Sequence, residues 1–168
     1  MRKKIIYYEC IGFIFVSILG TALHFAYSFS GYNPFVAFFV PINESIFEHL
    51  KLLFFPYLLY STLEYFSIGH KKCNFIFIKS ISCFAGLLFI PLTYYVFQAI
   101  RTPVPDFFNI SLFYITVLLS FVFSFVLIKK RVLHRFDWNA YGVFIFAFTM
   151  LLFFLCTVYP PNFNLFKA

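Results

Sequence analysis

A dense group of polar and ionisable side chains occupies residues 43–51 of an otherwise apolar chain, and one further histidine stands upstream. Charged groups within apolar segments are costly, so such a group indicates a functional site whose members have partners nearby. Carboxylates, imidazoles and an ammonium together can bind an ion, a small polar molecule or a lipid headgroup. The predicted ligand-binding residues are His24, Asn43, Glu44, Ser45, Glu48, His49 and Lys51.

The same residues allow acid–base or metal chemistry. Glu44 or Glu48 would be the general base, and His49 or Lys51 would stabilise negative charge. His24, Glu44 and Glu48 supply ligand types that suit zinc, manganese or iron, so the one cofactor that the residues suggest is a divalent metal. Against this, adjacent residues point about 100° apart on a helix, and the chain has no HExxH spacing. Catalytic residues and cofactor therefore stay open.

A purely structural interpretation explains part of this group. Ser45 and Glu48 have the spacing of a capping box, and Asn43 is itself a good helix cap. Acidic residues also suit the positive end of a helix dipole. Capping accounts for Ser45 and one glutamate, but not for the second acid, the adjacent histidine and Lys51.

A second polar set consists of Glu9, Glu64 and Lys79, each at least about one turn inside an apolar segment. A lysine between two acids on three helices is predicted to form a structural ion pair that fixes helix packing. The alternative is a proton or ion relay.

These side chains must be positioned by long apolar segments. Of the 168 residues, 62% are hydrophobic and 11% are charged, against about 25% charged in soluble proteins. Crossing a bilayer takes about 20 apolar residues, and long, non-alternating runs favour helices over barrel strands. We therefore predict an all-α, polytopic membrane helix bundle forming one domain over residues 1–168. Its five predicted transmembrane helices are residues 5–28, 43–68, 74–100, 107–127 and 138–158.

Positive charge between these spans predicts their orientation, because Lys and Arg accumulate on the cytoplasmic side. With five spans, only Arg101 and Lys167 fall on the opposite side. The N-terminus is thus expected inside and the C-terminus outside the cell membrane. The basic residues that share the inner side are Arg2, Lys3, Lys4, Lys71, Lys72, Lys129, Lys130, Arg131 and Arg135.

The net charge of +7 is explained by these topology signals and does not indicate a nucleic-acid partner. The predicted partners are the lipid bilayer and a lipid or small-molecule ligand.

Two sequence motifs carry a family resemblance. Residues 43–52 read Asn-Glu-Ser-x-x-Glu-His-Leu-Lys-Leu, and Tyr-Pro-Pro follows at residues 159–161. Both resemble an uncharacterised Firmicutes family of small multipass membrane proteins, classed as a domain of unknown function. The resemblance implies a multipass fold and importance for the polar residues of the first motif, but it supplies no activity. Asn162 departs from the family, which often has histidine there.

Three functions remain open from the sequence. The leading hypothesis is a protein that binds or transports a small polar ligand, an ion or a lipid headgroup in an outward-facing Glu/His/Lys pocket. The second is an intramembrane hydrolase, metal-dependent or not, acting on lipid. The third is a structural or accessory membrane subunit.

Overall fold

A computed structural model describes residues 2–130 and 136–167. Arg131 and Arg135, which contribute to the predicted charge asymmetry, lie outside the described residues. Within this part of the chain every regular element is helical, which confirms the all-α class. The long helices are α1 (Arg2–His24), α3 (Ile46–Ser67), α4 (Phe75–Ile100), α5 (Asp106–Lys130) and α6 (Asn139–Val158). The short elements are α2 (Ala26–Phe29), η1 (Val36–Phe38), η2 (Gly69–Lys71) and η3 (Asn164–Phe166).

Each predicted span corresponds to one long helix, with shifts at the ends. The largest shift is at the end of the first span, which the sequence predicts to continue to residue 28. In the structure α1 ends at His24, and the short α2 begins at Ala26. The second helix begins at Ile46 rather than at residue 43, because Ser45 has extended backbone geometry and caps it. Both changes occur beside the predicted polar site, and at Ser45 a side-chain hydrogen bond to the Glu48 N–H competes with helix continuation.

Four of the long helices are long and apolar enough to cross a membrane: residues Lys3–His24, Phe75–Ile100, Asp106–Lys130 and Asn139–Val158. The fifth long helix, α3, has 22 residues but also contains Glu48, Lys51 and Glu64. All three of these charged side chains are buried within the protein. The fold is therefore compatible with a membrane protein in which α3 is largely shielded by its neighbours.

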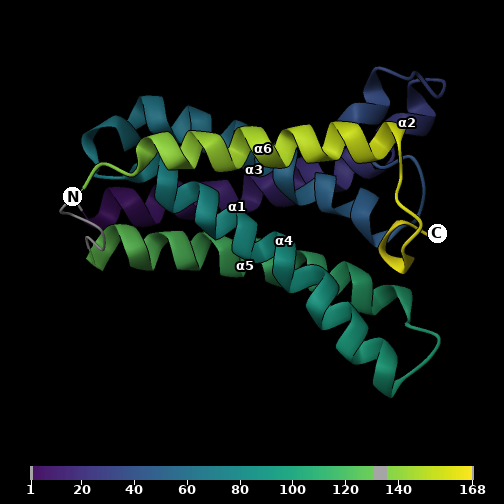
Figure 1. The fold of residues 1–168 in the computed structure, drawn as a ribbon. Coiled ribbons are helices and arrows are strands. Elements are labelled where there is room, and N and C mark those ends of the chain that lie inside the picture. The colour runs from purple at the N-terminus through teal and green to yellow at the C-terminus, as the bar shows by residue number, and fades with distance from the viewer. Residues whose placement is uncertain (1, 131–135, 168) are drawn as a thin grey trace.

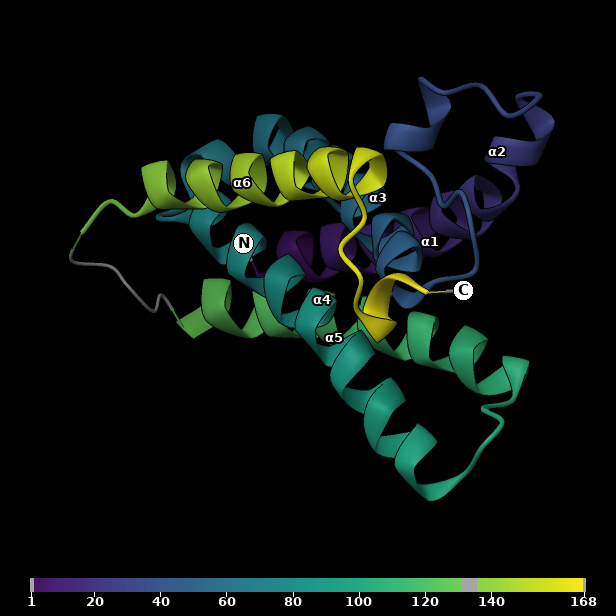
Figure 2. The same ribbon diagram turned by 45° about the vertical axis from the view of Figure 1, so that its right-hand side comes forward.

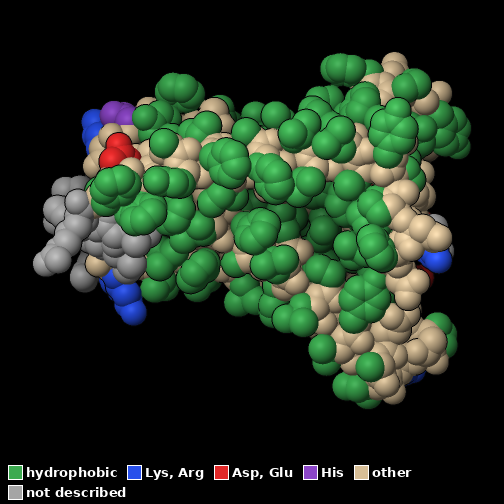
Figure 3. Space-filling model, in the orientation of Figure 1, with side chains coloured by type: hydrophobic (Ala, Val, Ile, Leu, Met, Phe, Trp, Pro, Cys, Tyr) green, Lys and Arg blue, Asp and Glu red, His purple; other side chains and the backbone are tan. Residues whose placement is uncertain are grey.

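Helices α1, α3, α4 and α5 form a closed ring, in which α1 contacts α3, α3 contacts α4, α4 contacts α5 and α5 contacts α1. Helix α6 packs outside the ring, mainly against α4 (Figures 1 and 2). The later part of α4 and the start of α5 diverge from the other helices in both views. Hydrophobic side chains cover the middle of the face drawn in Figure 3, and charged side chains lie at its two ends.

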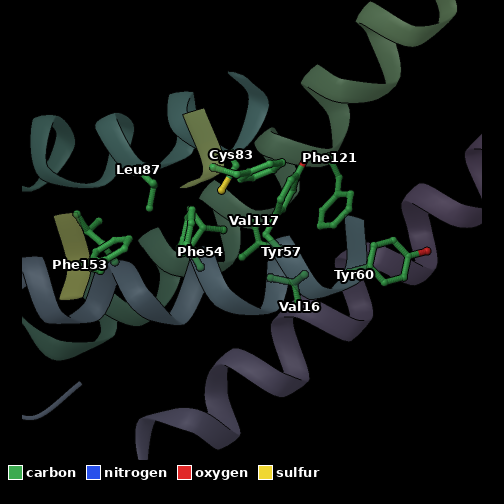
Figure 4. Packing of buried hydrophobic residues seen from close by; sticks show 12 residues of the cluster. Val16, Phe54, Tyr57, Tyr60, Cys83, Leu87, Val117, Phe121 and Phe153 are labelled. Carbon is green, nitrogen blue, oxygen red and sulfur yellow. The ribbon is translucent and has the colours of Figure 1, made fainter. Parts of the chain in front are cut away.

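The core is centred on α3. Its side chains Leu53, Phe54 and Tyr57 are almost fully buried and meet Val16 of α1 and Val117 of α5. Figure 4 shows this cluster, to which α4 adds Cys83 and Leu87 and α6 adds Phe153. Since α3 packs between other helices, its charged residues Glu48, Lys51 and Glu64 are buried against protein groups.

Close helix contacts depend on small residues. A Cβ added at Gly142 of α6 would lie 2.5 Å from the backbone nitrogen of Phe77 in α4. A Cβ at Gly20 of α1 would lie 2.7 Å from the Leu52 carbonyl oxygen in α3. Small residues at such crossings let helix backbones approach closely, as is common in membrane bundles.

Candidate functional site

The first polar cluster at the α2 end of the bundle is an ion pair that ties a loop to α3. Lys51 is 0% exposed, and its Nζ donates to Glu48 Oε2 at 2.7 Å. The same nitrogen donates to the carbonyl oxygens of Ala37 at 3.0 Å and Val40 at 3.4 Å. Glu48 Oε2 also accepts from the backbone N–H of Ile42 at 3.0 Å. An ammonium has three donors, so protein acceptors occupy all of them.

The cap of α3 fixes the residues just before the helix. Ser45 Oγ accepts from the backbone N–H of Glu48 at 3.4 Å, and Asn43 Oδ1 accepts from that of Ser45 at 2.9 Å. The Glu48 carboxylate does not complete a reciprocal capping box, because it is engaged by Lys51 and Ile42. Ser45 and Asn43 therefore use their side chains to fix the backbone at the start of α3.

A different trio gathers beside the cap. His24 ends α1, His49 lies in the first turn of α3, and Glu44 precedes the cap. His49 Nε2 lies 3.3 Å from Glu44 Oε2, and the two imidazole ring centres are 5.1 Å apart. One potential ligand atom from each of the three residues lies within 4.8 Å of the others. Glu44 is 77% exposed and His49 31% exposed at the side chain, so this His/Glu/His cluster is open to its surroundings.

The predicted site thus divides into two unlike groups. On a continuous helix the spacing of Glu44, Glu48 and Lys51 would put them on one face, but Glu44 lies outside α3 and its carboxylate meets His49. Among the predicted metal ligands, His24 and Glu44 lie together, whereas Glu48 turns inward to Lys51 and His49 takes its place. The divergence of adjacent side chains on a helix explains why Glu48 and His49 separate.

His49 is held in a defined orientation. Its Nδ1 lies 2.9 Å from the Ser45 carbonyl oxygen, the i−4 acceptor in the same helix. A carbonyl can only accept, so Nδ1 carries the proton, and in the neutral ring Nε2 presents a lone pair. Metal-binding histidines are commonly oriented in this way by a backbone carbonyl.

The second polar cluster lies toward the end of the bundle that holds the N-terminus, at the centre of the helix ring. Lys79 Nζ lies 2.8 Å from Glu9 Oε2 and 2.8 Å from Glu64 Oε2. Ser124 Oγ donates to the same Glu9 oxygen at 2.8 Å. We call Glu9, Glu64 and Lys79 the buried triad; with Ser124 it takes one residue from each helix of the ring. All four residues are buried.

The two ends are separated by packed apolar side chains. Between Lys51 and Glu64, the inward face of α3 presents Phe54, Tyr57 and Tyr60 to the core cluster. Aromatic contacts such as that between Tyr57 and Phe121, with ring centres 4.8 Å apart, fill this region. The charged side chains of the two polar clusters thus gather at two separate places in the bundle.

Comparison with known proteins places the chain in a family. The model of a family of unknown function (DUF6512) matches residues 1–168. The chain belongs to this family. Comparison with curated proteins and with solved structures gives no match.

For this member of DUF6512, the family match confirms the resemblance at the level of a family of unknown function that covers the whole chain. The motif, the taxonomic range and the multipass organisation remain predictions. No activity follows from the match.

Sequence reasoning missed the backbone partners of Lys51 and the hydroxyl partner of the buried triad. The carbonyls of Ala37 and Val40 lie in residues 36–42, a stretch without a charged side chain, so the pattern gave no signal for them. Ser124 had a signal, because it is a small polar residue inside an apolar span and lies one to two turns from the basic end of α5.

Proposed function

We propose that this chain is a five-span integral membrane protein of the cell membrane that binds one divalent transition-metal ion through His24, Glu44 and His49. The observation that carries the proposal is the convergence of two imidazoles and a carboxylate within 4.8 Å, with His49 already oriented by the Ser45 carbonyl. Of the three ligands that the sequence left open, which are a small polar molecule, an ion and a lipid headgroup, the proposal selects the ion.

The five-span topology rests on the position of α3. Its neighbours α1 and α4 meet the apolar criterion for crossing a membrane, and α3 packs between them over a comparable length. If α3 crosses the membrane as α1 does, two crossings separate Lys3 and Lys4 from Lys71 and Lys72, which places these basic clusters on one side. By the distribution of positive charge, that side is cytoplasmic. The His/Glu/His cluster then faces outward.

The distances suit a zinc-sized ion. Bonds of about 2.0–2.2 Å in a tetrahedron place ligand atoms roughly 3.3–3.6 Å apart. The distance of 3.3 Å between His49 Nε2 and Glu44 Oε2 already lies in this range. The ring of His24, the third ligand, needs a shift of about 1 Å to reach it. Two histidines and one carboxylate leave a position for water or a substrate group, which suits Zn²⁺ and related ions.

Binding is favoured over hydrolysis and over transport. Of the two candidate general bases, Glu48 is buried and engaged by Lys51, so its carboxylate is not free to take a proton from substrate. The other, Glu44, is one of the three proposed metal ligands. A transport path would have to pass the packed aromatic side chains between the two polar clusters. Neither obstacle affects ion binding at the open end of the bundle.

Isothermal titration calorimetry of the full chain in lipid nanodiscs, stripped with chelator and titrated with Zn²⁺, tests this function. We expect one ion per chain. Substituting a ligand, in His24→Gln or His49→Gln, should weaken affinity by more than about 100-fold, the upper end of the loss seen when only a ligand's supporting partner is removed. Glu44→Gln should weaken it by at least about tenfold.

His70→Gln provides the matched control, since His70 lies at the other end of the bundle near η2. This variant should bind Zn²⁺ as the wild type does. A wild type that takes up no Zn²⁺, or variants of all three ligands that retain wild-type affinity, would overturn the assignment.

A further inference from the structure

We propose that the buried triad is a proton-binding site, in which the carboxyl groups of Glu9 and Glu64 together hold one proton while Lys79 remains charged. This site is distinct from the His/Glu/His cluster, and the proposal does not depend on metal binding there. Its ligand is the proton, and its acceptors are carboxylate oxygens on α1 and α3.

The net charge of the buried triad is the first argument for this proposal. With both glutamates ionised, the triad has two negative charges and one positive charge. Lys79 is the only cation in ion-pair contact with either carboxylate within the described part of the chain. An unbalanced charge buried in an apolar interior is strongly unfavourable, so the group takes up a compensating proton. Two close carboxylates that share a proton are the familiar solution to this imbalance.

Burial and hydrogen bonding carry the second step. Glu9 is 6% exposed, Glu64 1% and Lys79 0%, so solvent does not compensate the charge. Oε1 of Glu9 and both carboxylate oxygens of Glu64 lack a hydrogen-bond partner among residues 2–130 and 136–167. These oxygens are deeply buried acceptors beside an ammonium that is already shared. They are the available positions for a bound proton.

Among the described residues, aromatic rings and uncharged polar groups surround the triad. The rings of Tyr57, Phe75 and Phe121 lie 5.0–5.8 Å from Lys79 Nζ. Around the triad, the titratable groups on the described residues include Tyr57, Tyr60 and Tyr65 on α3 and Cys83 on α4, all of which are neutral at ordinary pH. Helix α5 faces the triad with Ser124 and Phe121, and α6 faces that region with Phe146.

A cavity of about 310 Å³ between α3, α4 and α6 reaches Lys79 and Ser61. Its volume is enough for several water molecules at roughly 30 Å³ each. Apart from these two residues its lining is largely apolar, including Leu58, Phe146 and Met150. The cavity therefore borders the triad at Lys79, and its lining adds no counter-charge.

The chain has only four glutamates, so carboxyl carbons labelled with ¹³C can be resolved one by one. We would record NMR spectra of ¹³Cδ-glutamate protein in nanodiscs at pH 7. Wild type should show the Glu44 and Glu48 signals at ionised positions. The Glu9 and Glu64 signals together should indicate one proton, either at one site or averaged over both.

Single substitutions give the sharper result. In Glu64→Gln the triad is neutral without the extra proton, so the Glu9 signal should move to a fully ionised position. In Glu9→Gln the Glu64 signal should do the same. Glu44→Gln, which changes an exposed residue, should leave both signals unchanged.

Three results would overturn the proposal. They are four ionised glutamates in the wild type at pH 7, a protonated signal that persists in both single variants, and triad signals that respond to Na⁺ at constant pH. The last result would mean that a metal cation supplies the charge. Gln is close to Glu in shape, so both variants are expected to fold, and gel filtration would verify this.

Discussion

Lys51 and Lys79 are both completely buried, yet their environments differ in one respect. Lys51 meets one carboxylate, from Glu48, and two backbone carbonyls, so its cluster is electrically neutral. Lys79 meets two carboxylates, from Glu9 and Glu64, so its cluster carries an excess negative charge. Burial and ion pairing alone thus do not assign a role. The balance of charge distinguishes the two clusters: the neutral Lys51 cluster stabilises the fold, whereas the negatively charged buried triad is able to take up a further cation.

The largest effect should follow the loss of Lys79. Lys79→Met leaves two carboxylates buried without a counter-charge, which should lower the free energy of unfolding by about 3–5 kcal/mol. Unfolding in mixed micelles of increasing SDS content would measure this. Adding Glu9→Gln and Glu64→Gln to the same chain should restore most of the stability. A Lys79→Met protein as stable as the wild type would contradict the importance of this charge.

An intermediate effect should distinguish the two clusters directly. Glu48→Gln removes the single counter-charge of Lys51 and should cost about 2–3 kcal/mol in the same unfolding measurement. Glu64→Gln leaves the Glu9–Lys79 pair balanced and should change stability by less than about 1 kcal/mol. The chemical change is identical in the two variants. Equal losses would show that the clusters do not differ in charge balance.

The smallest effect should come from the cap of α3. Ser45→Ala removes the acceptor for the Glu48 N–H and should lower the free energy of unfolding by about 1 kcal/mol. The Ser45 carbonyl that orients His49 remains, so Zn²⁺ affinity should stay within about twofold of wild type. A larger loss of affinity would mean that the hydroxyl itself, and not only the backbone, positions the metal site.

Much of the fold could be predicted because long apolar runs admit few structures. Each of the five predicted spans corresponds to a helix, and α3 begins later than predicted because the Ser45 side chain caps it by binding a backbone N–H. The number of membrane crossings is a harder question. Helix α3 is less apolar than its neighbours because Glu48, Lys51 and Glu64 face protein, which its own hydropathy does not reveal.

The candidate site was predicted as a set of residues but not as an arrangement. His24, Glu44 and His49 come from the end of one helix, a loop and the start of another, so only packing of α1 against α3 brings them together. The buried triad was easier, since its three residues sit at comparable depths in consecutive spans. A lysine between two acids in an apolar segment has few other partners.

The sequence by itself determined that the chain is helical, that its surface is apolar, and that a few charges must be buried and paired. It did so because apolar run length and the cost of unpaired charge are local or compositional properties. Only the tertiary structure decided which carboxylate meets which cation. That choice depends on the rotation of each helix about its axis and on the path of the connection over residues 30–45. A rotation of about 100° separates Glu48, which holds Lys51 inside, from His49, which faces the open cluster.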